Sequence, residues 1–142
     1  MFNLSELVVA LNAGGIIAEL DVGKEPSLAN LTDLGRVQVG YHTIKAQSGL
    51  GDGVSSDSCL KLTQDLSFVF YTQFTCNLAD FPTFWDSIYA VVTNWIPTFT
   101  APDQDYTATF LEEGGKKGMA NGRIWWIDYW QIDFPRVQNA DI

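Results

Sequence analysis

The amino-acid sequence predicts an α+β fold in one domain. Two segments carry apolar residues at helical spacing, and five shorter segments alternate apolar and polar residues as strands do. The chain has 142 residues, 46% of them hydrophobic, which is enough for one packed core and too few for two. We therefore expect a single domain over residues 1–135, followed by a short tail over residues 136–142.

The first helix is expected to begin directly after Asn3, because leucines recur at helical spacing from Leu4 to Leu11. Asn3 can cap the N-terminus of this helix, and Gly14 and Gly15 can adopt the backbone conformation that ends it. Residues 16–22 then alternate in hydropathy, which predicts a strand with one drier face.

Two more strands are expected over residues 36–46 and 66–76, because their apolar side chains occupy every second position. The segment between them, residues 47–58, contains three glycines, four serines and two aspartates. That composition predicts an exposed loop.

The second helix is expected over residues 80–96. Asp80 or Asn77 can cap it, Pro82 is tolerated in its first turn, and Pro97 prevents its continuation. A broad apolar stripe must face the sheet, and it consists of Phe84, Trp85, Ile88, Val91, Val92 and Trp95.

The last two strands are expected over residues 106–113 and 123–134, joined by a loop at 114–122. A tighter hairpin that turns at Asn121-Gly122 is the alternative. The final strand is apolar on both faces, with Trp125, Ile127 and Tyr129 on the second one. Such a strand is either covered twice within its own chain or exposed to a partner chain.

The charge of the chain limits its partners. Its 17 acidic and 8 basic side chains give a net charge of −9, which opposes binding to nucleic acid or to an anionic membrane. The sequence contains no basic patch, and the two adjacent lysines Lys116 and Lys117 come nearest to one. No uninterrupted apolar run approaches the roughly 18 residues of a membrane span.

No residue pattern predicts catalysis, a metal site or a cofactor site, so we expect a protein that is not an enzyme. His42 is the only histidine and lies on a predicted strand, where a structural or solvated role is the usual one. Cys59 and Cys76 lack a metal-binding spacing, and small buried side chains are expected there.

Asp128 is the one acidic residue in an unusual place, because it shares a strand face with Trp126 and Trp130. It could be an acid of raised pKa in an aromatic cleft. The preferred interpretation is an edge or interface carboxylate that pairs with Arg123 or with a backbone donor.

The order of these elements resembles the tail terminator and tail completion proteins of long-tailed bacteriophages. The residues that carry the resemblance are the N-terminal helix, the aromatic strand at 67–71, the helix at 84–92 and the last strand at 122–128. The resemblance covers roughly residues 3 to 134 and concerns layout, since the family has no catalytic motif. It implies two helices packed on one face of a mostly antiparallel sheet.

The resemblance also implies a structural protein of the virion. Six copies would form a ring that ends the tail tube and joins it to the neck or head, with DNA passing through without specific binding. Its partners would be the tail tube protein and a neck or head-completion protein. The implied contacts between subunits or with the tube involve Leu50, Lys116, Lys117, Trp125, Ile127 and Tyr129. The implied acidic residues of the lumen are Asp52, Asp57, Glu112 and Glu113.

The alternative is a monomeric small-molecule-binding or cyclase-like domain. It would place Trp85, Trp126, Trp130 and Asp128 around an aromatic pocket. Another neck or baseplate adaptor of the same class of virus is a third possibility, which the sequence does not separate from the first.

Overall fold

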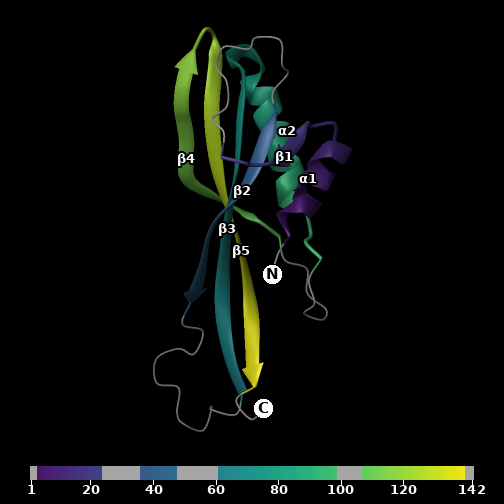
Figure 1. Ribbon diagram of the computed structural model, residues 1–142, viewed down its shortest axis with the longest axis vertical. Helices are drawn as coiled ribbons and strands as arrows, with labels where there is room; N and C mark the ends of the chain where they lie inside the picture. The colour runs from purple at the N-terminus through teal and green to yellow at the C-terminus, as the bar shows by residue number, and fades with distance from the viewer. Residues whose placement is uncertain (1–2, 24–35, 48–60, 99–106, 140–142) are drawn as a thin grey trace.

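A computed structural model describes residues 3–23, 36–47, 61–98 and 107–139 of the chain (Figure 1). The predicted α+β fold is confirmed, with two helices and one five-stranded sheet among these residues. In chain order the elements are α1 (Leu4–Ala13), β1 (Ala18–Leu20), β2 (Val37–Gln47), β3 (Lys61–Asn77), α2 (Phe81–Asn94), β4 (Thr109–Ala120) and β5 (Arg123–Asn139). A single 3₁₀ turn, Leu78–Asp80, leads into α2.

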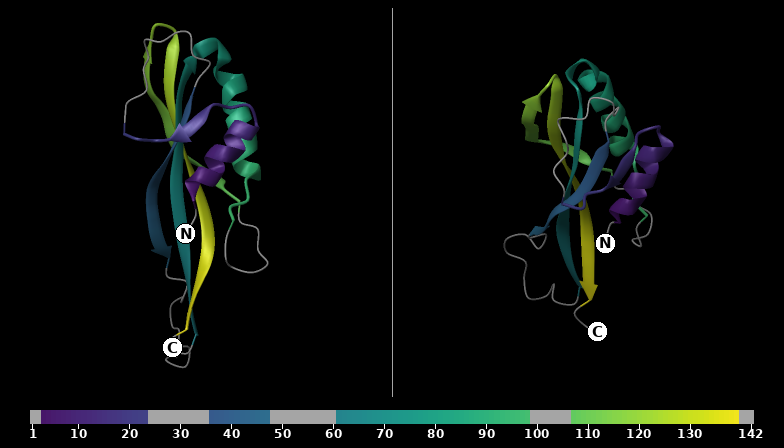
Figure 2. Two further views of the ribbon diagram at one scale, coloured as in Figure 1. Left: turned by 45° about the vertical axis from the view of Figure 1, so that its right-hand side comes forward. Right: turned by 45° about the horizontal axis from the view of Figure 1, so that its top comes forward.

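The strands lie in the order β1-β2-β3-β5-β4. β1 is parallel to β2, and the other three neighbouring pairs are antiparallel. Both helices lie on the same face of this sheet, as the turned views show (Figure 2). The mostly antiparallel arrangement with helices on one face is therefore as expected.

Local signals account for most helix ends. Asn3 accepts a hydrogen bond from the backbone N–H of Ser5 and so caps α1. Gly14 follows the last residue of α1, and Gly15 has a φ of 83°, a conformation that favours glycine. Asp80 precedes α2 and Asn77 precedes the 3₁₀ turn, but neither side chain makes a capping hydrogen bond, so neither of the expected caps is found.

The core lies between the helices and the long central strands. Side chains that alternate along β3 and β5 face α1 and α2, as the period of two predicts. The largest buried members are Leu4, Leu7, Leu11, Phe68, Phe70, Phe74, Ile88, Trp130 and Ile132. Burying side chains of this size supplies roughly 1.5–3 kcal/mol each, so this layer dominates the stability of the fold.

The connection between β4 and β5 corrects the expected loop at 114–122. β4 continues to Ala120, and Met119 pairs with Ile124 across a two-residue turn. Asn121 and Gly122 have φ angles of 55° and 74°, as a tight hairpin turn of this kind requires. The alternative hairpin is the correct one.

β4 is an irregular strand. Its pairing with β5 shifts between Leu111 and Gly115 and again between Lys116 and Gly118. At the first shift Gly114 lies so close to β5 that an added Cβ would be 2.2 Å from the carbonyl oxygen of Ile127. A side chain at position 114 therefore cannot fit without moving one of the two strands.

The sheet also extends beyond the helices. We call residues 40–47, 61–69 and 131–139 the arm. Its base still belongs to the core through Phe68 and Ile132, and from there it projects as a ribbon away from both helices in Figure 1. Its pairing ends where Lys61 meets Asn139. Residues 136–139 therefore belong to β5, and a tail beginning at residue 136 was the wrong prediction.

Candidate assembly surface

The face of the sheet opposite the helices holds three of the predicted interface residues. Ile127 is only 7% exposed, whereas Trp125 and Tyr129 are half-buried. The indole N–H of Trp125 donates to Gln73, and the ring of Tyr129 lies 6.2 Å from that of Tyr71. Much of this second apolar face is thus covered by its own chain, which weakens it as a contact surface.

A polar network ties the same face together. Tyr71 donates its hydroxyl to the carboxylate of Asp21, and Gln73 donates to both Asp21 and Gln38. Burial raises the pKa of Tyr71 to about 12, and the Asp21 carboxylate adds to the rise. The Tyr71 ring reaches Asp21 by lying across Gly40, where an added Cβ would meet the ring at 2.3 Å. These groups are occupied with one another, which indicates a structural role.

His42 lies at a β-bulge in β2, where the pairing with β3 shifts between Tyr41 and Thr43. Its side chain is exposed, and its ring is 4.9 Å from that of Tyr129. No group of three or more metal-binding side chains occurs among the described residues.

The other predicted contact residues are placed unevenly. Lys116 and Lys117 are exposed on β4, and Glu113 is exposed on the same strand. Glu112 also belongs to β4, but its side chain lies outside what the structure describes. Leu50, Asp52 and Asp57 all lie outside the described residues, as does Cys59.

Asp128 is buried in the core, with 1% of its surface exposed. One carboxylate oxygen accepts from the indole N–H of Trp126 at 2.7 Å, and the other has no hydrogen-bond partner among the described residues. Burial raises the pKa of Asp128 to about 6, which the indoles of Trp126 and Trp85 only partly oppose. Asp128 is therefore not the expected edge or interface carboxylate, because it is buried on a strand between two others. Its oxygens accept neither from Arg123 nor from a backbone donor among the described residues, and the Arg123 guanidinium donates to Thr75.

The aromatic residues around Asp128 pack closely. Trp126 lies 4.8 Å from Phe81, Trp85 lies 5.1 Å from Tyr89, and Trp130 lies 5.4 Å from Phe110, measured between ring centroids. These separations are those of aromatic pairs in contact. The indoles predicted to surround a ligand are therefore packed against other rings.

Cys76 is buried, as expected for a small apolar side chain. Burial raises the pKa of its thiol to about 11, although the nearby Arg123 opposes this. A thiol in this state is a poor nucleophile.

An apolar groove of about 460 Å³ lies where the arm leaves the helices, lined by Tyr41, His42, Thr43, Ile44 and Phe68. Tyr41 and Ile44 are 55% and 46% exposed, while Phe68 is fully buried. The Tyr41 hydroxyl also accepts from the backbone N–H of Leu4, which joins the first turn of α1 to the arm. Local sequence patterns do not reveal this groove, because it depends on the pairing of β2 with β3.

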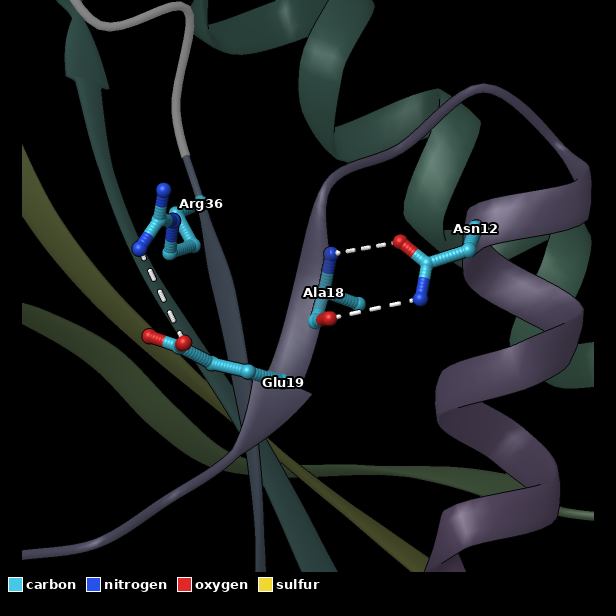
Figure 3. A network of polar contacts seen from close by, with 4 residues as sticks. All are labelled: Asn12, Ala18, Glu19 and Arg36. Carbon is cyan, nitrogen blue, oxygen red and sulfur yellow. Dashed lines mark hydrogen bonds and ion pairs between the residues drawn. The ribbon is translucent and has the colours of Figure 1, made fainter.

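The edges of the sheet differ from one another. At β1 the side-chain amide of Asn12 closes the edge, because it accepts from the N–H of Ala18 at 3.0 Å and donates to its carbonyl at 3.3 Å (Figure 3). Nearby, an exposed ion pair of 3.7 Å joins Glu19 of β1 to Arg36, the residue directly before β2 (Figure 3). At the other edge, β4 is broken by two register shifts.

The edges of the arm are more open. The β5 edge has no register shift, and the β2 edge has one, at the bulge at His42. β1 pairs with β2 only as far as Val39, and β4 pairs with β5 only as far as Gln131. Within the described ranges, no strand pairs with the outer side of residues 40–47 or of residues 132–139. Unpaired backbone of this kind readily adds another strand.

Comparison with known proteins gave no relative: neither the scan of protein-family models nor the search of curated proteins found a match. Among the described residues, no helix is long and apolar enough to cross a membrane.

Proposed function

We propose that this protein is a structural, non-enzymatic subunit of a ring at the end of a bacteriophage tail tube. The ring would stop growth of the tube and join it to the neck or head of the virion. In this proposal the ring contains six copies of the chain, and its partners are the tail tube protein and a neck or head-completion protein. The proposal begins from the resemblance in layout.

The arm is the observation that carries the proposal. Beyond Gln47 its ribbon narrows to β3 and β5 alone, and no helix covers it in Figure 1. A two-stranded ribbon is at best marginally stable in water by itself. Contact with neighbouring subunits would supply the missing stabilisation.

The charge of the protein supports the same proposal. A passage for DNA benefits from walls that do not hold phosphate, and a net charge of −9 is suited to this. Asp52, Asp57, Glu112 and Glu113 are our candidates for the lumen. A ring with a neutral or basic lumen would count against the assignment.

Native mass spectrometry tests the ring. The purified protein is expected to give a discrete hexamer, and electron microscopy should show rings capping tail tubes. Added to growing tubes, the protein should stop elongation at substoichiometric amounts. A protein that stays monomeric at high concentration and low salt, with no effect on tube length, would refute the proposal.

A second candidate is a small-molecule-binding or cyclase-like domain, and the observation that favours it is Asp128. A buried carboxyl with a raised pKa among aromatic side chains is often part of a binding or active site. Quenching of tryptophan fluorescence by candidate ligands in a monomeric protein would support this candidate. The close packing of Trp85 and Trp126 with neighbouring rings favours the ring proposal instead.

A further inference from the structure

We infer that the two edges of the arm pair with one another between neighbouring copies of this chain. Residues 40–47 of β2 in one subunit would form a parallel ladder with residues 132–139 of β5 in the next. This inference rests on the proposed ring and specifies how its subunits join.

The topology makes such pairing geometrically possible. β2 and β5 are each antiparallel to β3, so they run parallel to one another on opposite sides of it. Rotating one subunit about an axis along the arm keeps its strand direction and brings its β5 edge beside the β2 edge of its neighbour. Because two different edges meet, the contact is head-to-tail, and such contacts close into rings when the rotation permits.

Charge complementarity favours a second copy of this chain as the partner of the edge. Lys45 pairs with Ser67, and Ser67 pairs with Asp133, so the three residues form one row across the arm. Lys45 and Asp133 are both exposed and stand at opposite edges on the same face. With the rows of neighbouring subunits aligned, Lys45 of one copy lies beside Asp133 of the next, and opposite charges attract in such cross-strand positions.

The groove supplies apolar contact on the other face of the same edge. Ile44 is 46% exposed on β2, one residue from Lys45, and forms the wall of the groove above Phe68. A strand added at this edge would cover Ile44 and part of Tyr41. Apolar burial and backbone pairing would then act together, as in known cases of strand addition.

The remaining edges are less suited to the contact. Asn12 already occupies the outer N–H and carbonyl of Ala18 in β1. β4 combines two register shifts with the exposed Lys116 and Lys117, features that protect an edge from pairing. β2 carries the bulge at His42 and the exposed Lys45, but Asp133 of the neighbouring copy offers Lys45 an opposite charge.

Charge reversal tests the pairing. Lys45→Asp leaves acidic groups at both edges, and Asp133→Lys leaves basic groups at both. Each variant alone should associate about tenfold more weakly or worse in native mass spectrometry and light scattering, because like charges meet. An equimolar mixture should recover the oligomer of the unchanged protein, since the two variants alternate around an even-numbered ring. Asp86→Lys, at an exposed position of α2, is the matched control for Asp133→Lys and should leave association unchanged.

A disulfide test does not depend on those variants. Within one chain, positions 45 and 133 are separated by β3, so their strands lie about 10 Å apart, too far for a disulfide. Cys76 is buried, so replacing Cys59 with serine removes the other native thiol that could interfere. In this Cys59→Ser background, the double variant Lys45→Cys/Asp133→Cys should link only between subunits and give a ladder that ends at the ring number on a nonreducing gel. Neither single variant should give more than a covalent dimer.

The outcomes separate this inference from the proposed function. A ring that persists in both charge-reversed variants and forms no ladder would overturn the edge pairing while leaving the ring. An unchanged protein that remains monomeric at every concentration would overturn both.

Discussion

The two halves of the sheet are stabilised in different ways. The half beneath α1 and α2 buries a continuous apolar layer, with Phe74, Ile88 and Trp130 all fully buried. The arm is built from the same strands, yet it leaves Tyr41 and Ile44 about half exposed and two backbone edges unpaired among the described residues. The covered half therefore has more apolar burial within its own chain than the outer part of the arm has. Substitutions in the two halves should therefore affect different measurements.

The largest effect is expected from Trp130→Ala in the covered half. Trp130 is fully buried, contacts Phe110 and Tyr89, and donates its indole N–H to Thr72. Truncation should lower the free energy of unfolding by about 3–5 kcal/mol. Urea unfolding followed by circular dichroism measures this, and a loss below about 1 kcal/mol would show that the described packing is wrong.

The next largest effect concerns the buried Asp128. Because its pKa is raised to about 6 from 3.8, the folded state holds the proton more tightly than the unfolded chain does. The stabilisation that results is fully present below pH 3.8 and is lost as the pH rises through about 6. The free energy of unfolding falls by at most about 3 kcal/mol over this range.

Asp128→Asn keeps an acceptor for the Trp126 indole and removes the buried charge. The variant should be more stable than the unchanged protein at pH 7. Its free energy of unfolding should not decline between pH 4 and 7. Denaturant titrations at several pH values measure this. Asp86→Asn, at an exposed position of α2, removes an equal charge and should not flatten the profile.

Gly114→Ala should cost about 1–3 kcal/mol, because its Cβ would meet the backbone of β5 and force the two strands apart. Gly14→Ala is the matched control. A Cβ there meets the side chain of Val91 at 3.1 Å, which a small shift relieves. Equal melting temperatures for the two variants would contradict the close approach at Gly114.

The smallest effect on folding is expected from Ile44→Thr in the arm. Since Ile44 is already 46% exposed, the unfolding free energy of the monomer should change by no more than about 0.5 kcal/mol. Association, measured by light scattering, should weaken. A loss of stability comparable with that of Trp130→Ala would erase the distinction between the two halves.

Local patterns in the sequence explain how much of the fold could be predicted. Asn3 and Gly15 mark the ends of α1, and alternation marks the core faces of β3 and β5. β4 was predicted too short because glycines and lysines have weak strand propensity. Its path past Gly114 is set by pairing with β5, which is a tertiary contact. The correct local signal was Asn121-Gly122.

The candidate surface was harder to predict for a related reason. Trp125 and Ile127 are apolar, and this suggested a partner, but neighbouring strands already cover most of them. Lys45 and Asp133 are ordinary charged residues in the sequence. They become a matched pair only through the register of two ladders that share Ser67. Long-range register cannot be read from local periodicity.

The ladder between β3 and β5 also bears on the order of events in folding. Its end at Asn77 and Arg123 adjoins α2, whereas its other end joins Lys61 to Asn139 across a much longer stretch of chain. Closing the shorter loop first costs less entropy, and each later pair then adds beside one already formed. The ladder should therefore close from the helices toward the tip of the arm. The edges that we assign to subunit contact are then completed last, so association follows folding and does not compete with it.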